Sequence, residues 1–104
     1  MVNNIRQDEI PEPPTHYLGV GAVVLNEKLD KILLGYEPRW KMWKVPTGLA
    51  DKKETIKMAV IRELKEETGI NADFKGIISF WEAFPMTFGF SDIYFNCLLI
   101  ANEN

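Results

Sequence analysis

One segment of the chain, residues 51–70, carries stronger signals for a defined structure than any other. The run 55–68 contains neither glycine nor proline. Gly69 and Ile70 follow it, a pair typical of a helix that ends in a left-handed residue and an apolar contact. At the other end, Asp51 and Glu54 fit a capping box, with Asp51 accepting a hydrogen bond from a backbone N–H near Glu54. These signals predict a helix over 55–68.

This predicted helix breaks its own apolar pattern with acidic residues. Its buried stripe on a helical wheel would consist of Ile56, Ala59, Val60 and Leu64. Glu63 and Glu67 fall inside the same sector and Glu66 at its border, so three carboxylates share one side. Like charges at this spacing repel one another, more strongly when they are desolvated, and a cation among them would offset the repulsion. Hard divalent cations such as Mg²⁺ or Mn²⁺ prefer oxygen ligands of this kind. The alternative is a solvated acidic helix end, paired with Arg62 and Lys65.

Size, composition and charge exclude several classes of protein. The 104 residues suit one domain, and 46% apolar with 26% charged residues is typical of a globular chain rather than a disordered one. No apolar run is long enough to cross a membrane, and no secretory signal is visible at the start. A net charge of -3 argues against a protein that neutralises nucleic-acid phosphates, so a bound polyanion would need a metal ion to supply positive charge.

The single cysteine and the single histidine carry no evident site. Cys97 has no second cysteine for an internal disulfide or a thiolate zinc site, and we expect it to pack within a strand. This fits a reducing compartment, and we expect a cytoplasmic protein, with the nucleus and organelles left open. His16 lies in a proline-rich lead-in over residues 1–16, and we expect no metal or base role for it.

The remaining pattern predicts a mixed sheet. Apolar, β-branched runs indicate strands over 18–25, 31–36, 74–84 and 90–100, and the first two should form a hairpin. Residues 37–44 read as a loop or short strand, and 46–48 break the pattern. We therefore expect an α/β (α+β) domain over 17–104, with a mixed sheet and a helix packed on it.

The acidic helix and the turn before it match a known motif. Its fixed positions are filled by Gly48, Glu54, Arg62, Glu63, Leu64, Glu66, Glu67, Gly69 and Ile70. This spacing is that of the Nudix box, so the chain resembles the Nudix hydrolase superfamily. The resemblance implies an α/β/α sandwich around a mixed sheet. It also implies metal-dependent hydrolysis of a nucleoside diphosphate linked to another moiety, by attack of water at a phosphorus, with Mg²⁺ or Mn²⁺.

The resemblance also implies a metal site. Glu63 and Glu67 would be the main metal ligands, and Glu66 would bind the metal directly or through water. The backbone carbonyl of Thr47 or of Gly48 would complete the coordination.

The same resemblance implies catalytic roles beside the metal. Arg62 would hold a carboxylate in place, with Glu54 as its salt-bridge partner. One of the acidic residues, Glu63 or Glu66 among them, would help to deprotonate the attacking water.

A narrower resemblance joins the chain to one group of the superfamily. The stretch 88–97 is similar to the group that holds the fibroblast-growth-factor antisense-type protein and plant pyrophosphohydrolases of ADP-ribose and NADH. That group has an Arg-Gln-x-His stretch after the box, where this chain reads Trp81, Glu82, Ala83 and Phe84. Glu82 is thus a candidate substitute base or extra ligand, or else a solvent-facing strand residue.

Four aromatic residues are candidates for substrate binding. Trp40, Trp43, Trp81 and Phe88 could each stack on a base or ribose, although aromatic residues on strands and loops also serve as core or rim. We expect a small-molecule nucleoside diphosphate derivative as the partner. A membrane partner is not expected, nor a nucleic acid, apart from a capped RNA end.

The chain ends soon after the last predicted strand. Nudix domains usually continue with a further strand and a helix over one face of the sheet, so we expect an exposed apolar patch here. A second copy or a partner subunit would cover it. The function alternative to catalysis is a non-catalytic Nudix-fold module that binds a nucleotide or a protein, or a subunit of a larger assembly.

Overall fold

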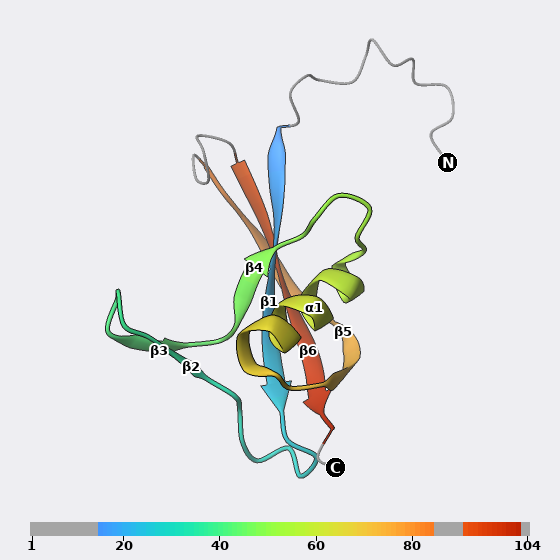
Figure 1. Cartoon of the computed structure of the whole chain (residues 1–104). Helices are drawn as coiled ribbons and strands as arrows, with labels where there is room; N and C mark the ends of the chain where they lie inside the picture. Colours follow the sequence, from blue (N-terminus) through green and yellow to red (C-terminus); the bar gives the residue numbers. More distant parts are fainter. Residues whose placement is uncertain (1–14, 85–90, 103–104) are drawn as a thin grey trace.

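The computed structural model describes residues 15–84 and 91–102 (Figure 1). The elements in chain order are β1 (His16–Leu25), β2 (Gly35–Glu37), β3 (Met42–Lys44), β4 (Thr47–Leu49), α1 (Ile56–Thr68), β5 (Ala72–Ala83) and β6 (Ser91–Ala101). The expectations for Phe88 and for residues 1–14 of the lead-in lie outside the described residues.

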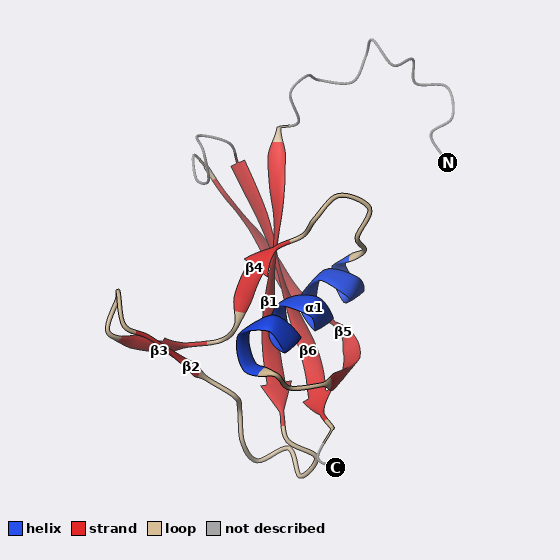
Figure 2. Ribbon diagram, in the orientation of Figure 1, coloured by secondary structure: helices blue, strands red, loops and turns tan. Residues whose placement is uncertain are grey.

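Four of the strands form one mixed sheet. Their order is β4-β1-β6-β5, in which β1 and β6 run parallel and the other two pairs are antiparallel. Figure 2 shows α1 lying across one face of this sheet, while the β2–β3 hairpin projects to the side. The predicted mixed sheet with a helix packed on it is confirmed. No helix in the described ranges is long and apolar enough to cross a membrane.

The core lies between α1 and the sheet. The helix contributes Ala59, Val60 and Leu64, as the wheel predicts, and the strands contribute Val20, Ala22, Val24, Ala72, Cys97 and Leu99. Ile56, the fourth residue of the predicted stripe, is half-buried at the edge of this cluster. Cys97 is fully buried, as expected, and burial raises the pKa of its thiol, which disfavours the nucleophilic thiolate.

The two ends of the helix differ in how well they follow the prediction. Gly69 ends the helix with a φ of 76°, and its N–H donates to the carbonyl of Lys65 at 2.8 Å, as expected. At the start the prediction of Asp51 as the cap was wrong. Thr55 is the N-cap, and its hydroxyl accepts from the N–H of Met58 at 3.1 Å, since the turn after β4 continues to Thr55 and the first helical residue is Ile56. Asp51 instead donates its N–H to the carboxylate of Glu54 at 2.8 Å.

The predicted hairpin between 18–25 and 31–36 was also wrong. A single bridge joins Leu25 to Ile32, after which the chain leaves the sheet and β2 pairs with β3. The reason is competition for one edge of β1, because β4 pairs with that edge at Gly19 to Gly21. Thr47 and Gly48, predicted to break the pattern, therefore belong to a short strand.

On the sheet face opposite α1, the side chain of Tyr94 from β6 lies over two glycines of β1. Val20 faces the core, so its neighbours Gly19 and Gly21 face the other side. A Cβ added to Gly21 would overlap the hydroxyl of Tyr94, and one on Gly19 would lie 3.0 Å from the ring. The Tyr94 ring packs in turn against Trp81, with ring centroids 5.4 Å apart. The tyrosine above the strand therefore requires glycine at position 21, while Gly19 leaves room for its ring.

We expect Gly21→Ala to lower the free energy of unfolding by about 1–3 kcal/mol, the usual cost of forcing an extra methyl group into a packed site. Gly35→Ala is the matched control, because a Cβ there meets its nearest neighbour, the Lys44 carbonyl oxygen, at 3.9 Å. Urea unfolding followed by tryptophan fluorescence would measure both. Equal losses in the two variants would contradict this account of Gly21.

Candidate active site

The candidate site is organised around one arginine. The guanidinium of Arg62 donates two hydrogen bonds to the Glu54 carboxylate, at 2.7 and 3.0 Å, and a third to the carbonyl of Leu49, at 3.0 Å. Two parallel bonds of this kind fix direction as well as distance. The hydrogen bond from Arg62, followed by that from the Asp51 N–H, lowers the pKa of Glu54, and Glu54 in turn raises the pKa of Arg62. The structure thus brings together the two residues expected to pair.

The same guanidinium also contacts two of the three carboxylates on α1. Its Nη1 donates to Glu63 at 3.0 Å and to Glu66 at 2.9 Å. The side chain of Glu63 is 18% exposed and that of Glu66 is 59% exposed, so one faces the sheet and the other faces solvent. Arg62 therefore offsets part of the repulsion that the sequence pattern predicts for this side of the helix.

Gly48 lets the helix carboxylate reach β4. Gly48 pairs with Val20 of β1 and faces α1, and a Cβ added there would overlap the carboxyl group of Glu63. Glycine is the one residue that leaves this space to the carboxylate. The acidic side chain and the backbone of the strand are consequently held in direct contact.

The register of β4 separates the two backbone carbonyls named as candidate ligands. Pro46 accepts from Ala22 of β1, and Ala50 donates to Leu18 of β1, both at 2.8 Å. Along an antiparallel strand, alternate residues direct their N–H and C=O groups toward the partner strand. Gly48 therefore bonds to β1, and the N–H and C=O groups of Thr47 and Leu49 point to the outer edge of the sheet. The carbonyl of Thr47 therefore faces the side of the strand where the helix carboxylates lie.

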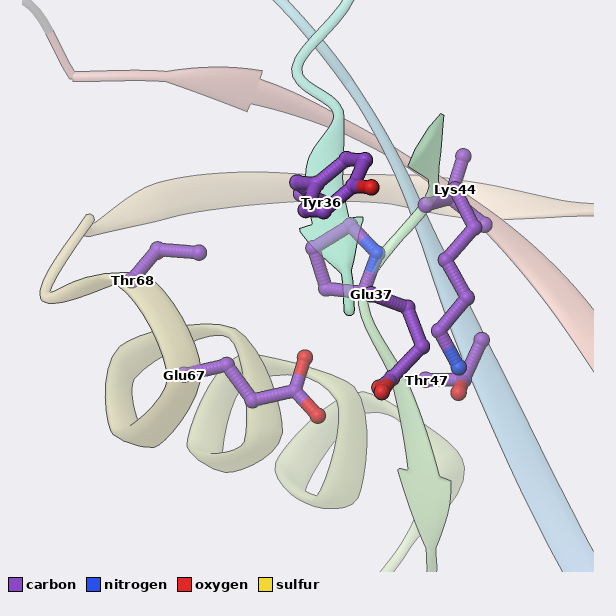
Figure 3. Close-up of a pocket in the computed structure, with 9 residues that line it drawn as sticks. Tyr36, Glu37, Lys44, Thr47, Glu67 and Thr68 are labelled. Carbon is purple, nitrogen blue, oxygen red and sulfur yellow. The ribbon is translucent and has the colours of Figure 1, made fainter. Parts of the chain in front are cut away.

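Glu67 is set apart from the arginine and faces a pocket. Figure 3 shows its carboxylate directed into a cavity of about 340 Å³ between α1, β4 and the β2–β3 hairpin. Desolvation, followed by the negative charge of Glu63, raises the pKa of Glu67, whereas Lys44 and a hydrogen bond from the Thr47 backbone oppose the rise. The ionised form of Glu67 is thus disfavoured by the protein itself.

The carboxylates fit a divalent metal in their chemistry. Within residues 15–84 and 91–102, no three acidic, histidine or cysteine side chains already converge on one point as a closed metal site. Arg62 holds Glu63 and Glu66, and Glu67 turns toward the pocket. All three are nevertheless hard oxygen donors on one side of α1, next to the outward carbonyl of Thr47, which is a set that Mg²⁺ or Mn²⁺ accepts.

The aromatic candidates are not gathered at this pocket. Trp40 is exposed beside the hairpin turn, Trp43 packs edge-on against Tyr36, and Trp81 packs against Tyr94. Phe88 lies outside the described residues. No tryptophan is among the described residues that line the cavity.

Glu82 is likewise separate from the helix carboxylates. It pairs with His16 across the end of the sheet, where the distance between Oε2 and Nε2 is 2.6 Å. His16 has a partner that its sequence neighbours did not reveal.

Two residues that sequence reasoning missed line the pocket opposite Glu67. They are Glu37 and Lys44, from the two strands of the hairpin. No sequence signal could have identified them, because their placement depends on β2 pairing with β3 and on the hairpin lying next to α1.

Comparison with known proteins agrees with the geometry. The model of the NUDIX domain matches residues 15–102. The chain belongs to the NUDIX domain family. Among its Nudix relatives, Nudix hydrolase 10 of Arabidopsis thaliana is 42% identical over 93 residues, covering 89% of this chain and 33% of the relative. Nucleoside diphosphate-linked moiety X motif 6 of Xenopus laevis is 38% identical over 95 residues, covering 88% of this chain and 44% of the relative. The chain thus spans between a third and a half of the length of these relatives.

Solved Nudix structures share the fold. A NUDIX hydrolase from Nitrosomonas europaea superposes with a TM-score of 0.69 at 21% identity, covering 85% of this chain and 48% of the other. A bifunctional NMN adenylyltransferase/ADP ribose pyrophosphatase from Francisella tularensis, complexed with AMP and a manganese ion, superposes with a TM-score of 0.63 at 26% identity. The match covers 82% of this chain and 27% of that one.

We expect Gly48→Ala to weaken Mn²⁺ binding about tenfold or more while the chain stays folded, because the added methyl group must displace the Glu63 carboxylate. Electron paramagnetic resonance of free Mn²⁺ would measure the affinity, and circular dichroism the fold. Gly35→Ala is the control, because the added Cβ makes only an ordinary contact there, at 3.9 Å from the Lys44 carbonyl oxygen. Unchanged Mn²⁺ affinity in Gly48→Ala would contradict the placement of Glu63.

We expect Glu67→Gln to stabilise the metal-free protein at neutral pH. The pKa of Glu67 is raised on folding, so its contribution to stability is full below the unfolded value and is lost as the pH rises through the folded value. Glutamine removes this dependence. Urea midpoints at pH 4 and pH 7.5 should show the variant gaining on the wild type only at the higher pH. A lower midpoint for the variant at pH 7.5 would contradict the prediction.

Proposed function

We propose that this chain is a Nudix pyrophosphohydrolase domain that hydrolyses a nucleoside diphosphate linked to another moiety. The observation that carries the proposal is the contact of Arg62 with Glu54, Glu63 and Glu66, beside the close packing of Glu63 on Gly48. This arrangement orders the acidic residues of the complete box along one side of α1. Membership of the NUDIX domain family supports the same reading.

Mg²⁺ or Mn²⁺ is the proposed cofactor. Glu63 and Glu67 would hold it, with Glu66 directly or through water and the carbonyl of Thr47 as a further ligand. A bound divalent cation would activate water and offset the charge that develops on the phosphate groups. The Francisella neighbour is described with AMP and a manganese ion, which supports a nucleotide and metal in this fold.

The protein's own groups have distinct parts in the proposed reaction. Water adds its oxygen to one phosphorus of the diphosphate, the bridging P–O bond breaks, and the bridging oxygen leaves with the other phosphate. One proton of the water passes to a carboxylate and then to solvent, and the other stays on the new phosphate. Glu66 suits the proton transfer because it is the more exposed of the two carboxylates on Arg62. Arg62, held by Glu54, keeps those carboxylates in place.

The substrate, the cellular location and the partner are further proposals. The stretch 88–97 resembles the group that acts on ADP-ribose and NADH, so we propose these two compounds as the first substrates to try. A cytoplasmic location fits the buried, unpaired Cys97. The expectation of a second copy or partner over exposed apolar side chains of β5, such as Phe80 at 71% exposure, stays a prediction.

The test is hydrolysis of a panel of ADP-ribose, NADH and dinucleoside polyphosphates with Mg²⁺ or Mn²⁺. We expect turnover by the wild type and a loss of about 100-fold or more in Glu67→Gln, because a metal ligand is removed. Circular dichroism would establish that both proteins are folded, and Lys57→Gln on the exposed side of α1 is the control.

Two outcomes would overturn the proposal. Near wild-type turnover of Glu67→Gln at saturating Mn²⁺ would remove Glu67 from the metal site. A folded wild type without turnover of any substrate would favour the non-catalytic binding module instead, with Arg62 as the permanent cation among the carboxylates.

A further inference from the structure

The pocket beside Glu67 has a second wall that the Nudix box does not supply. The described residues that line it are Gly35, Tyr36, Glu37, Lys44, Val45, Pro46, Thr47, Glu67 and Thr68. Glu67 and Thr68 come from the end of α1, and the remainder from the β2–β3 hairpin, residues 45–46 and the start of β4. The hairpin therefore forms the side of the pocket that faces the helix.

The register of the hairpin directs two charged side chains into this pocket. Gly35 pairs with Lys44 and Glu37 pairs with Met42, so Glu37 and Lys44 share one face of the ribbon. They stand on the diagonal of the pair, a spacing that long side chains can span. Figure 3 shows both pointing toward the side where Glu67 enters from α1. One cation and one anion thus face the carboxylate of the box.

The opposite face of the hairpin stiffens the wall. Tyr36 and Trp43 are directly paired there, with ring centroids 5.3 Å apart and an interplanar angle of 64°. An edge-to-face aromatic pair of this kind adds stability beyond its buried area. Glu37 is also oriented locally, because its Oε1 accepts from the N–H of Arg39 at 3.1 Å. The carboxylate of Glu37 is therefore oriented before any ligand arrives.

We propose that this pocket binds a ribosyl phosphate end of the substrate, with Lys44 on the phosphate and Glu37 on the ribose hydroxyls. Lys44 is the one positively charged residue among the described lining residues, and the chain as a whole is acidic. A phosphate brought next to Glu67 needs such a cation, and carboxylates accept hydrogen bonds from ribose hydroxyls in other nucleotide sites. The proposal rests on the proposed function, because that function places the reacting diphosphate beside Glu67.

Size and charge agree with this ligand. A cavity of about 340 Å³ lies at the small end of the range for ligand sites, which suits one sugar phosphate rather than a whole dinucleotide. Lys44 opposes the rise in the pKa of Glu67, so its ammonium group lies within electrostatic reach of the proposed metal ligand. A phosphate on Lys44 would therefore be next to the carboxylates that carry the reaction.

Binding of 5′-AMP, the simplest ribosyl phosphate common to the panel, tests the pocket without metal or turnover. Isothermal titration in EDTA should show Lys44→Gln and Glu37→Gln each weakening AMP about tenfold, and Lys44→Arg restoring most of the affinity. Lys57→Gln and Asp73→Asn, at exposed positions outside the pocket, are the charge-matched controls. Affinity that falls equally in the controls, or a wild type that binds no AMP, would overturn the proposal.

Steady-state kinetics with the best substrate of the panel gives the second readout. We expect Lys44→Gln and Glu37→Gln each to raise KM about tenfold, and Glu37→Gln to change kcat by less than about threefold, because the ribose hydroxyls lie away from the reacting phosphorus. A KM unchanged by both variants, in an enzyme that turns over, would overturn the pocket assignment and leave the proposed function intact. Tighter Mn²⁺ binding by Lys44→Gln with an unchanged KM would instead identify the pocket as a second cation site.

If the wild type binds AMP through Lys44 and Glu37 but hydrolyses nothing, the proposed function fails and the pocket assignment stands. AMP affinity therefore tests the pocket, and turnover tests the proposed function, so the failure of one can be distinguished from the failure of the other.

Discussion

The guanidinium of Arg62 is the contact on which the arrangement of the site depends. It bonds to the turn before the helix through Glu54, to the edge strand β4 through the carbonyl of Leu49, and to its own helix through Glu63 and Glu66. A single planar group with several donors can make all of these contacts at once, which a lysine could not. Apart from Arg62, packing at the helix, the short loop and the hydrogen bond from the Thr47 backbone to Glu67 also join these parts of the chain.

The sheet supplies the fixed frame for that contact. β4 is only three residues long, and its two edges have different partners. The inner edge pairs with β1, and on the outer edge the carbonyl of Leu49 accepts from Arg62 of α1. Gly48 removes the side chain that would keep the helix away, and Glu63 fills the space. The position of the acidic residues is thus set by main-chain pairing, which is far less adaptable than side-chain packing.

The local features of this chain were predictable from its sequence. Helix 56–68, its end at Gly69 and its buried residues follow from spacing within one turn, so a wheel and capping rules recover them. The N-cap was misplaced because Asp51 and Thr55 both belong to the residue types that cap helices, and only the path of the turn decides between them. The pairing of Arg62 with Glu54 was available only through the resemblance to a family, not from the residues alone.

The long-range features were not predictable in the same way. The segment 31–36 has the composition of a strand, but β4 takes the edge of β1 that it would need, and nothing local records that competition. Likewise the choice between the carbonyls of Thr47 and Gly48 depends on the register of β4 against β1. The wall formed by Glu37 and Lys44 needs both the hairpin register and its placement beside α1. Each of these is a property of contacts between distant segments.

The double contact of Arg62 with Glu63 and Glu66 also bears on when a metal ion can join the protein. In small zinc domains the free energy of metal binding supplies the free energy of folding, so the apo chain is unfolded. Here the guanidinium of Arg62 already offsets part of the charge of Glu63 and Glu66, and the hydrophobic core of α1 and the sheet contains neither of them. If the proposed function holds, the chain would complete its fold in metal-poor surroundings and bind the metal ion afterwards, so that metal supply would limit its activity and not its folding.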